Sequence, residues 1–403
     1  MDLVNVDDVR AAAQRLTDVV QRTPVELSRA LSAEVGRPVL LKCENLQRAG
    51  SFKIRGATNR ITQLDEGEQR RGVVCASAGN HAQGVALAAA HTGVAATVFM
   101  PVDAPLPKVE ATEAYGAAVR LEGSAFDEAL ANAVAFAEAT NAVFVHPFDH
   151  PDIIAGQGTI GLELDEQLPA DVAAVVVPVG GGGLISGVAA ALRDLRPGIR
   201  IIGVQAAGCA PFPASLASGR PEALPRADTI ADGIAVKRPG VLTLAHVHAL
   251  VDEVVTVDDD AIASAVVHLL ERAKLVVEPA GAVAVAAVRA GLVDADGPLG
   301  IILSGGNIDP LLLRGLITSG LAAEGRYLTF TSRISDSPGS LMRLLKTIAH
   351  ERGNVIGVEH HRFAPRLRYG QVEVLVELEM RGPEHITQLT GVLRDAGYPI
   401  KRV

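Results

Sequence analysis

Four consecutive glycines interrupt the stretch Val177-Pro178-Val179-Gly180-Gly181-Gly182-Gly183-Leu184, which begins as an apolar strand and ends at the start of a helix. Glycine allows the backbone to come close to a ligand, and the first turn of a helix offers free N–H groups and a positive dipole. The stretch therefore predicts a strand, a phosphate-binding turn and a helix. A purely structural glycine turn between the same elements is the alternative.

Outward from this turn, short apolar strands alternate with helices of about ten residues, a pattern typical of βαβ units. Hydrophobic residues make up 48% of the chain, aromatic residues only 3%, and tryptophan is absent. The cores must therefore be aliphatic, as in parallel sheets covered by helices. We predict a doubly wound α/β fold that opens with an amphipathic helix over 6–20. The strands are expected at 39–43, 72–76, 95–100, 117–121, 142–145, 173–179, 200–204 and 299–303.

The last part of the chain has a different pattern. With 403 residues the chain is too long for one ordinary core, so two or three domains are expected. From residue 326 onward the order strand, helix, strand, strand, helix, strand predicts a separate ferredoxin-like α+β unit over 326–403. The segment 321–325 is interpreted as the linker that precedes it.

Composition and charge exclude several classes of function. A net charge of -9 argues against binding nucleic acid through its phosphates. The acidic start of the chain does not resemble a signal peptide, and no apolar run reaches the roughly 18 residues of a membrane span. Three cysteines without the spacing of a metal pair indicate a reducing compartment. We therefore expect a cytoplasmic protein that binds neither nucleic acid nor a membrane.

A lysine stands at a second loop–helix junction, Ser51-Phe52-Lys53-Ile54-Arg55-Gly56-Ala57. The positive end of a helix dipole makes a charged ammonium group less stable there, which favours the neutral, nucleophilic amine. Taken alone, the stretch is better explained by a solvated surface lysine, because most lysines near the start of a helix are exposed.

Two further loops follow apolar strands. Ser77-Ala78-Gly79-Asn80-His81 is expected at the carboxyl edge of a parallel sheet, at a switch in strand order. Its amides and the Ser77 and Asn80 side chains suit a carboxylate and a ring hydroxyl, although either residue also suits a helix N-cap. In Ser304-Gly305-Gly306-Asn307 the hydroxyl can face a heterocyclic nitrogen or cap a turn.

Several rival sites are rejected. The glycine turn lacks the G-x-G-x-x-G spacing, and the next strand ends in Gln205 instead of an acid that would hold a ribose. No Gly-Lys-Ser/Thr follows the glycines, so it is not a Walker loop. His146 and His150 have a helical metal spacing, but Pro147 and Pro151 are incompatible with a helix there, and we expect no metal.

An amine, a phosphate turn, a carboxylate loop and a hydroxyl for a ring nitrogen together describe a site for pyridoxal 5'-phosphate. The four motifs, in this order and separation, resemble the threonine ammonia-lyase (threonine dehydratase) and serine racemase branch of the fold-type II enzymes that use this cofactor. The resemblance covers roughly residues 1–320. It implies two doubly wound open-sheet subdomains, the smaller one at about 50–150. The tail, with Asp336-Ser337-Pro338-Gly339-Ser340 and Gly353-Asn354-Val355, resembles a regulatory ACT domain that binds amino acids.

The resemblance also implies roles for individual residues. Lys53 holds the cofactor as a Schiff base and then acts on the Cα proton of the substrate. Ser77, Asn80 and His81 with its neighbouring amides hold the substrate carboxylate, and Asn80 also bonds the ring 3'-oxygen. Ser304 meets the pyridine nitrogen. The phosphate is bound by Gly180, Gly181, Gly182, Gly183 and Leu184.

Two departures from the racemase pattern favour elimination. Racemisation needs an acid–base group on each face of Cα, and the racemases of this branch carry a serine where this chain has Ala78. Related racemases also bind a divalent metal through an acid near Gln205. An amide at this position, followed by Pro211, argues against that metal and leaves a monovalent cation open.

We therefore expect a lyase that converts L-threonine to 2-oxobutanoate and ammonia, with L-serine to pyruvate as a side activity. The alternatives are a serine ammonia-lyase, a serine racemase or an amino-acid sensor without catalysis. Residues 231–237 look like the catabolic enzymes, whereas the ACT-like tail suggests feedback in isoleucine biosynthesis. An amino-acid or nucleotide effector and a homo-oligomer, a dimer or a tetramer, are expected.

Overall fold

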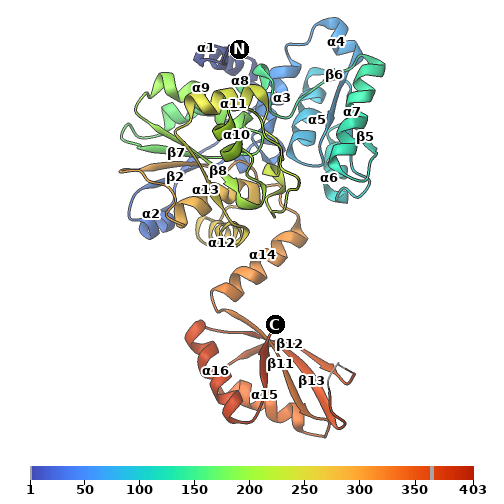
Figure 1. The fold of residues 1–403 in the computed structure, drawn as a ribbon, viewed down its shortest axis with the longest axis vertical. Helices are drawn as coiled ribbons and strands as arrows, with labels where there is room; N and C mark the ends of the chain where they lie inside the picture. The colour runs from blue at the N-terminus through green and yellow to red at the C-terminus, as the bar shows by residue number, and fades with distance from the viewer. Residues whose placement is uncertain (1, 364–366) are drawn as a thin grey trace. The chain divides into compact units, whose positions relative to one another are not determined.

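The computed structural model describes residues 2–363 and 367–403 (Figure 1). The chain divides into two compact units, Met1–Asp309 and Pro310–Val403. Each unit has a sheet and a hydrophobic core of its own. No helix in the described part of the chain is long and apolar enough to cross a membrane.

The larger sheet of the first unit has six strands, and only the edge strand β1 is antiparallel to its neighbour. Val175, Val177 and Val179 pack with residues of α8 and α9 on one face, and α13 contacts the sheet on the other. Both faces are covered, which explains the nearly continuous apolar strands. In sheet order the strands are β1 (Val25–Leu27), β2 (Val39–Lys42), β10 (Leu299–Ile302), β7 (Ala174–Pro178), β8 (Arg200–Ala206) and β9 (Glu253–Val257). The three helices are α8 (Pro151–Gln167), α9 (Gly183–Leu195) and α13 (Pro279–Arg289).

A smaller parallel sheet lies within the same unit (Figure 1). Alternate residues of its central strand pack on opposite sides, Val73 and Cys75 with α3 and α5, and Val74 and Ala76 with α7. Its strands are, in order, β5 (Ala118–Leu121), β4 (Ala96–Met100), β3 (Val73–Ala76) and β6 (Val143–Phe144). The helices are α3 (Lys53–Ile61), α5 (Asn80–Thr92) and α7 (Phe126–Thr140).

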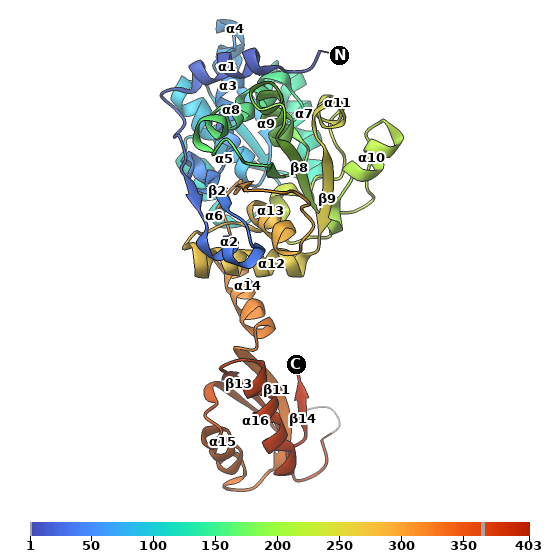
Figure 2. The same ribbon diagram turned by 90° about the vertical axis from the view of Figure 1, so that its left-hand side faces the viewer.

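The remaining helices of the first unit surround the two sheets (Figure 2). The first of them begins where the sequence predicts, since Asn5 caps it in a capping box with Asp8, but it ends at Leu16 instead of continuing to residue 20. These helices are α1 (Val6–Leu16), α2 (Arg29–Val35), α4 (Glu66–Arg71), α6 (Leu106–Ala114), α10 (Phe212–Ser218), α11 (Val241–Leu250) and α12 (Asp259–His268).

The second unit contains the expected βαββαβ order. Its antiparallel sheet buries alternate residues of β11 and β13 beneath α15 and α16, around Phe330 and Val374. In chain order the elements are α14 (Pro310–Ala323), β11 (Tyr327–Ser335), α15 (Ser340–His350), β12 (Asn354–His361), β13 (Gln371–Glu379), α16 (Pro383–Asp395) and β14 (Ile400–Arg402). The predicted linker needs correction, because α14 includes the first three residues of 321–325 and the second unit already begins at Pro310.

The strand order creates two crevices at the carboxyl ends of the sheets. β3 lies between β4 and β6, and β7 lies between β10 and β8, so the chain crosses over in opposite directions from each central strand. Ligands of open α/β sheets bind at such switch points. The loop 77–79 follows β3, the glycine turn follows β7, and Ser304 comes shortly after β10. The predicted position of loop 77–79 is therefore confirmed.

Candidate active site

Lys53 is fixed beside the end of β10 by backbone pairing. The Phe52 N–H donates to the Ser304 carbonyl (3.2 Å), and Ser51 and Gly305 form an isolated antiparallel bridge. The Gly306 N–H donates in turn to the Gly50 carbonyl (2.9 Å). Two segments about 250 residues apart in sequence are thus joined like strands, so the lysine helix and the Ser304 loop form one rigid edge.

The amine of Lys53 loses its proton more readily than that of an ordinary lysine. Its Nζ donates to the Pro147 carbonyl (3.0 Å) and lies 5.2 Å from the centroid of the Phe52 ring. Burial lowers the pKa of Lys53 to about 8, against the opposing attraction of Glu278. The predicted shift toward the neutral amine is found, but its main cause is burial and not the helix dipole.

The glycine turn has no room for side chains. A Cβ on Gly181 would lie 2.3 Å from the Phe148 ring, and one on Gly182, whose φ is +97°, would lie 2.7 Å from Cζ of Phe212. Among the described residues, the amides of Gly180, Gly181, Gly182 and Gly183 donate to no protein acceptor. Free N–H groups at the start of α9 fit a phosphate group.

The segment Pro147–Phe148 connects the lysine to this turn. The Pro147 carbonyl accepts the hydrogen bond from Lys53, and the next residue, Phe148, places its ring against Gly181 and its Cβ and backbone against Gly183. The Lys53 amine and the glycine turn therefore contact two consecutive residues, Pro147 and Phe148.

The loop after β3 differs from the glycine turn because it carries polar side chains. Ser77 accepts at Oγ from the Gly79 N–H (3.1 Å), and Asn80 begins α5. His81 is 5% exposed, and its Nε2 bonds the Val145 carbonyl (2.9 Å), so the ring anchors the loop to the end of β6. Burial lowers the pKa of His81 to about 3, which keeps the ring neutral. Nε2 of His81 is therefore occupied by the bond to Val145.

Ser304 is 4% exposed, and its hydroxyl makes one long contact, 3.5 Å from Oγ to the Ala280 carbonyl. A buried hydroxyl with so weak a partner has hydrogen-bonding capacity left for a ligand. This property fits a ring nitrogen, which requires a single polar neighbour.

Sequence reasoning missed Glu278, which stands before α13 and is 5% exposed. Its Oε1 accepts from Nδ2 of Asn80 (2.6 Å), and Oδ1 of Asn80 accepts from Nδ2 of Asn307 (2.8 Å). Asn307 also donates to the Ala49 carbonyl (2.7 Å). An acidic residue between an apolar segment and an alanine-rich helix was the only signal in the sequence.

Other polar candidates have structural partners. Gln205 accepts at Oε1 from the Phe212 N–H (3.0 Å). His146 accepts at Nδ1 from the Asp149 N–H (2.8 Å), and His150 caps the start of α8. Within the described residues no group of three His, Cys, Asp or Glu side chains is arranged to hold a metal.

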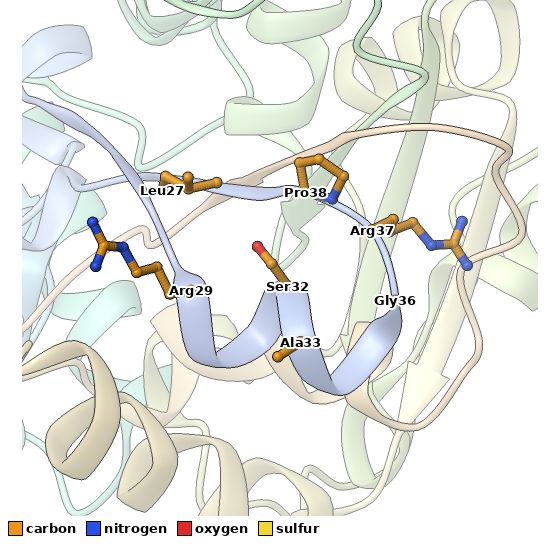
Figure 3. A pocket seen from close by; sticks show the side chains of 7 residues that line it. All are labelled: Leu27, Arg29, Ser32, Ala33, Gly36, Arg37 and Pro38. Carbon is orange, nitrogen blue, oxygen red and sulfur yellow. The ribbon is translucent and has the colours of Figure 1, made fainter.

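A surface pocket is lined only by residues 27–38, none of which belongs to the loops described above (Figure 3). The side chains of Arg29 and Arg37 extend to opposite sides of it, so they do not converge on one anion. The pocket is therefore not part of the active site.

A partly neutral lysine beside a turn of free amides is what an α/β enzyme with a phosphorylated carbonyl cofactor needs, and this is the class that the fold and the site define. The chain belongs to the pyridoxal-phosphate dependent enzyme family, whose model matches residues 16–305.

Similar proteins span the whole chain or its first unit. An L-threonine ammonia-lyase of Thermotoga maritima is 48% identical over 401 residues, and the alignment covers 100% of this chain and 100% of that protein. Processed threonine deaminase isoform 2 of Solanum lycopersicum superposes with a TM-score of 0.75 at 39% identity, over 78% of this chain and 86% of that chain. Maize serine racemase gives a TM-score of 0.74 at 39% identity, over 80% of this chain and 100% of that chain.

Proposed function

We propose that this protein is a pyridoxal-phosphate dependent L-threonine ammonia-lyase, which forms 2-oxobutanoate and ammonia, with L-serine to pyruvate as a side activity. The observation that carries the proposal is the amine of Lys53, whose pKa is about 8, next to the glycine turn. The full-length similarity to a threonine ammonia-lyase supports the choice of substrate.

Each loop has a part in this reaction. Lys53 would hold the cofactor through its amine and would act as the base toward the Cα proton of the substrate. The amides of 180–184 would hold the phosphate, Ser304 the ring nitrogen and Asn80 the ring oxygen. Ser77 and the first amides of α5, including that of His81, would hold the substrate carboxylate. When bound, the cofactor supplies the electron sink that allows loss of the β-hydroxyl.

The choice between elimination and racemisation depends on Ala78. Ala78 is only partly buried, and its methyl group cannot carry a proton. Proton transfer from the second face of Cα then has no donor at this position, which favours elimination. Serine racemase remains the second candidate because the maize enzyme superposes on the first unit.

Turnover assays test the proposal. The purified protein should show a visible absorption band with pyridoxal 5'-phosphate and release 2-oxobutanoate from L-threonine. A Lys53→Ala variant should lose both. Accumulation of D-serine from L-serine would favour the racemase, and a colourless wild-type protein would refute the assignment.

The second unit supports a regulatory role. Its βαββαβ order and four-stranded antiparallel sheet are those of ACT domains, so we assign it as one that binds an amino-acid or nucleotide effector. Titration of activity with isoleucine, valine and AMP tests this assignment, and sedimentation tests a dimer or tetramer. A cytoplasmic location agrees with three free, buried cysteines, Cys43, Cys75 and Cys209.

A further inference from the structure

Glu278 and Asn80 are joined by a part-buried hydrogen bond that the proposed reaction does not use. Oε1 of Glu278 lies 2.6 Å from Nδ2 of Asn80, although 198 residues separate the two in sequence. At its other end the Asn80 amide accepts from Nδ2 of Asn307 (2.8 Å). Because an acceptor and a donor hold its opposite ends, the amide has one orientation.

The carboxylate has a fixed place in the fold. The Glu278 N–H donates to the Gly305 carbonyl (3.1 Å), and the Glu278 carbonyl accepts from the first turn of α13. A Cβ on Gly305 would lie 2.3 Å from Oε1, and one on Gly233 would lie 3.6 Å from it. A side chain at position 305 would therefore collide with the carboxylate, whereas one at position 233 would only touch it.

One hydrogen of the Asn80 amide group is still available. Nδ2 carries two hydrogens and donates one to Glu278, while no other acceptor for this nitrogen occurs in the part of the chain that the structure describes. The second hydrogen is therefore free for a ligand at the edge formed by the lysine and Ser304 loops.

We propose that Glu278 is a positioning residue for the cofactor ring: its carboxylate holds the Asn80 amide so that the second Nδ2 hydrogen binds the ring oxygen. This inference rests on the proposed function and extends it to a residue outside the recognised motifs. The contact needs a neutral amide with its nitrogen turned toward the ring, and the acceptor at position 278 holds that nitrogen while the Asn307 donor holds the oxygen.

The charges around Glu278 make the contact sensitive to pH. Burial raises the pKa of Glu278 to about 7, the nearby Asp232 adds to this, and the Asn80 bond, Lys108 and Lys53 oppose it. Above this pH the carboxylate is a charged acceptor, and its bond to Asn80 is stronger than a neutral one. Below it the group is neutral and resembles a glutamine.

A double-mutant cycle on the full-length chain, freed of cofactor, tests the proposal. The probe is 4-deoxypyridoxine 5'-phosphate, which has the ring hydroxyl and the phosphate but no aldehyde, so lysine chemistry does not contribute. We expect Glu278→Ala to weaken binding at least tenfold at pH 8.5. In an Asn80→Ala background the same change should weaken it less than twofold, because the two residues act through one contact. An equal loss in both backgrounds, or none in either, would overturn the proposal.

A pH series on Glu278→Gln tests the role of charge and remains informative if the alanine variant does not fold. Glutamine keeps the acceptor oxygen, so binding should be about fivefold weaker than wild type at pH 8.5 and equal to it at pH 6. A ratio that stays constant with pH would contradict the proposal. The exposed Glu113→Gln should bind within twofold of wild type throughout.

Failure of this proposal is separable from failure of the proposed function. If wild-type protein binds pyridoxal 5'-phosphate and consumes L-threonine but the cycle is additive, only the role of Glu278 is wrong. If wild-type protein shows no visible band with that cofactor, the proposed function itself fails.

Discussion

Replacing Arg55 by methionine should destabilise the first unit strongly, because it leaves a carboxylate buried without its partner. Arg55 and Glu44 are both 0% exposed, and the guanidinium donates through two nitrogens to Glu44 at 2.8 Å each. It also donates to Glu163 (2.6 Å) and to Oγ1 of Thr159 (3.0 Å). All four interactions are lost in Arg55→Met.

The expected size follows from the burial of Glu44. Removing one partner of a buried ion pair costs about 3–5 kcal/mol of stability, because the remaining carboxylate loses its main partner and keeps only the Thr23 hydrogen bond and the attraction of Lys42. With about 2 °C per kcal/mol for a unit of this size, Tm should fall by about 6–10 °C. In the double variant Glu44→Leu/Arg55→Met no unpaired charge remains at these two sites, so it should be more stable than Arg55→Met alone.

The loss of stability in Arg55→Met should also depend on pH. Burial raises the pKa of Glu44, but Arg55 and Lys42 outweigh it, so the folded pKa lies below the ordinary value. The stability from Glu44 is thus present above about pH 4.3 and is lost as pH falls through its folded pKa. Without Arg55 the buried carboxyl takes up a proton at higher pH, so the difference between variant and wild type should shrink between pH 7 and pH 5.

Thermal unfolding of the cofactor-loaded protein, followed by loss of the visible band, reports on the first unit alone. Arg22→Met is the matched control, because Arg22 and Glu166 form an ion pair with side chains 55% and 62% exposed. Such exposed pairs contribute less than about 1 kcal/mol. A loss below 1 kcal/mol in Arg55→Met, or a double variant less stable than the single one, would refute the reasoning.

The remaining predictions concern the active site. The rate at which cofactor-free protein captures pyridoxal 5'-phosphate should rise with pH, with a midpoint near the Lys53 pKa of about 8. At that pH about half of the amine is neutral, compared with less than about 1% for an ordinary lysine. Stopped-flow absorbance measures this rate, and a midpoint near 10 would contradict the prediction. Gly182→Ala should lose the cofactor in dialysis, because the φ of residue 182 is +97° and the new Cβ would lie 2.7 Å from Phe212. The control Gly198→Ala should retain the cofactor, because no atom lies within 4 Å of a Cβ at position 198. Ala78→Ser restores a hydroxyl at the second face of Cα, and D-serine formed from L-serine should rise at least tenfold by chiral chromatography; no rise would exclude this explanation of reaction choice.

The fold could be predicted wherever the burial of side chains leaves a hydrophobic pattern in the sequence. Strands covered on both faces, such as β7, read as apolar runs, and the alternation in β11 and β13 reveals one buried face. The edge strand β1 was missed because its three residues are mostly exposed. Helix α14 was partly read as a linker, since Gly315 and Gly320 lower its helix propensity without ending it.

The candidate site could be proposed from the sequence where loops present their own backbone N–H groups. Glycine turns and a lysine before a helix leave signatures of a few residues, because a loop supplies its own N–H groups. Glu278 has no such signature, since its partner Asn80 is reached only through the tertiary fold. The contact between Glu278 and Asn80 depends on how both sheets fold, and no local sequence pattern carries that information.

The ion cluster around Arg55 also bears on catalysis, because Lys53 is the first residue of the same helix. α3 approaches α8 so closely that a Cβ on Gly56 would lie 2.4 Å from Nε2 of Gln157, and the Gly56 N–H donates to Oε1 of that side chain (3.1 Å). The low pKa of Lys53 comes mainly from burial, and this burial is set by the position of the helix. A variant such as Arg55→Met that still folds should therefore admit water near the lysine and raise its pKa. The stability of the ion cluster around Arg55 and the reactivity of the Lys53 amine therefore both depend on the position of α3.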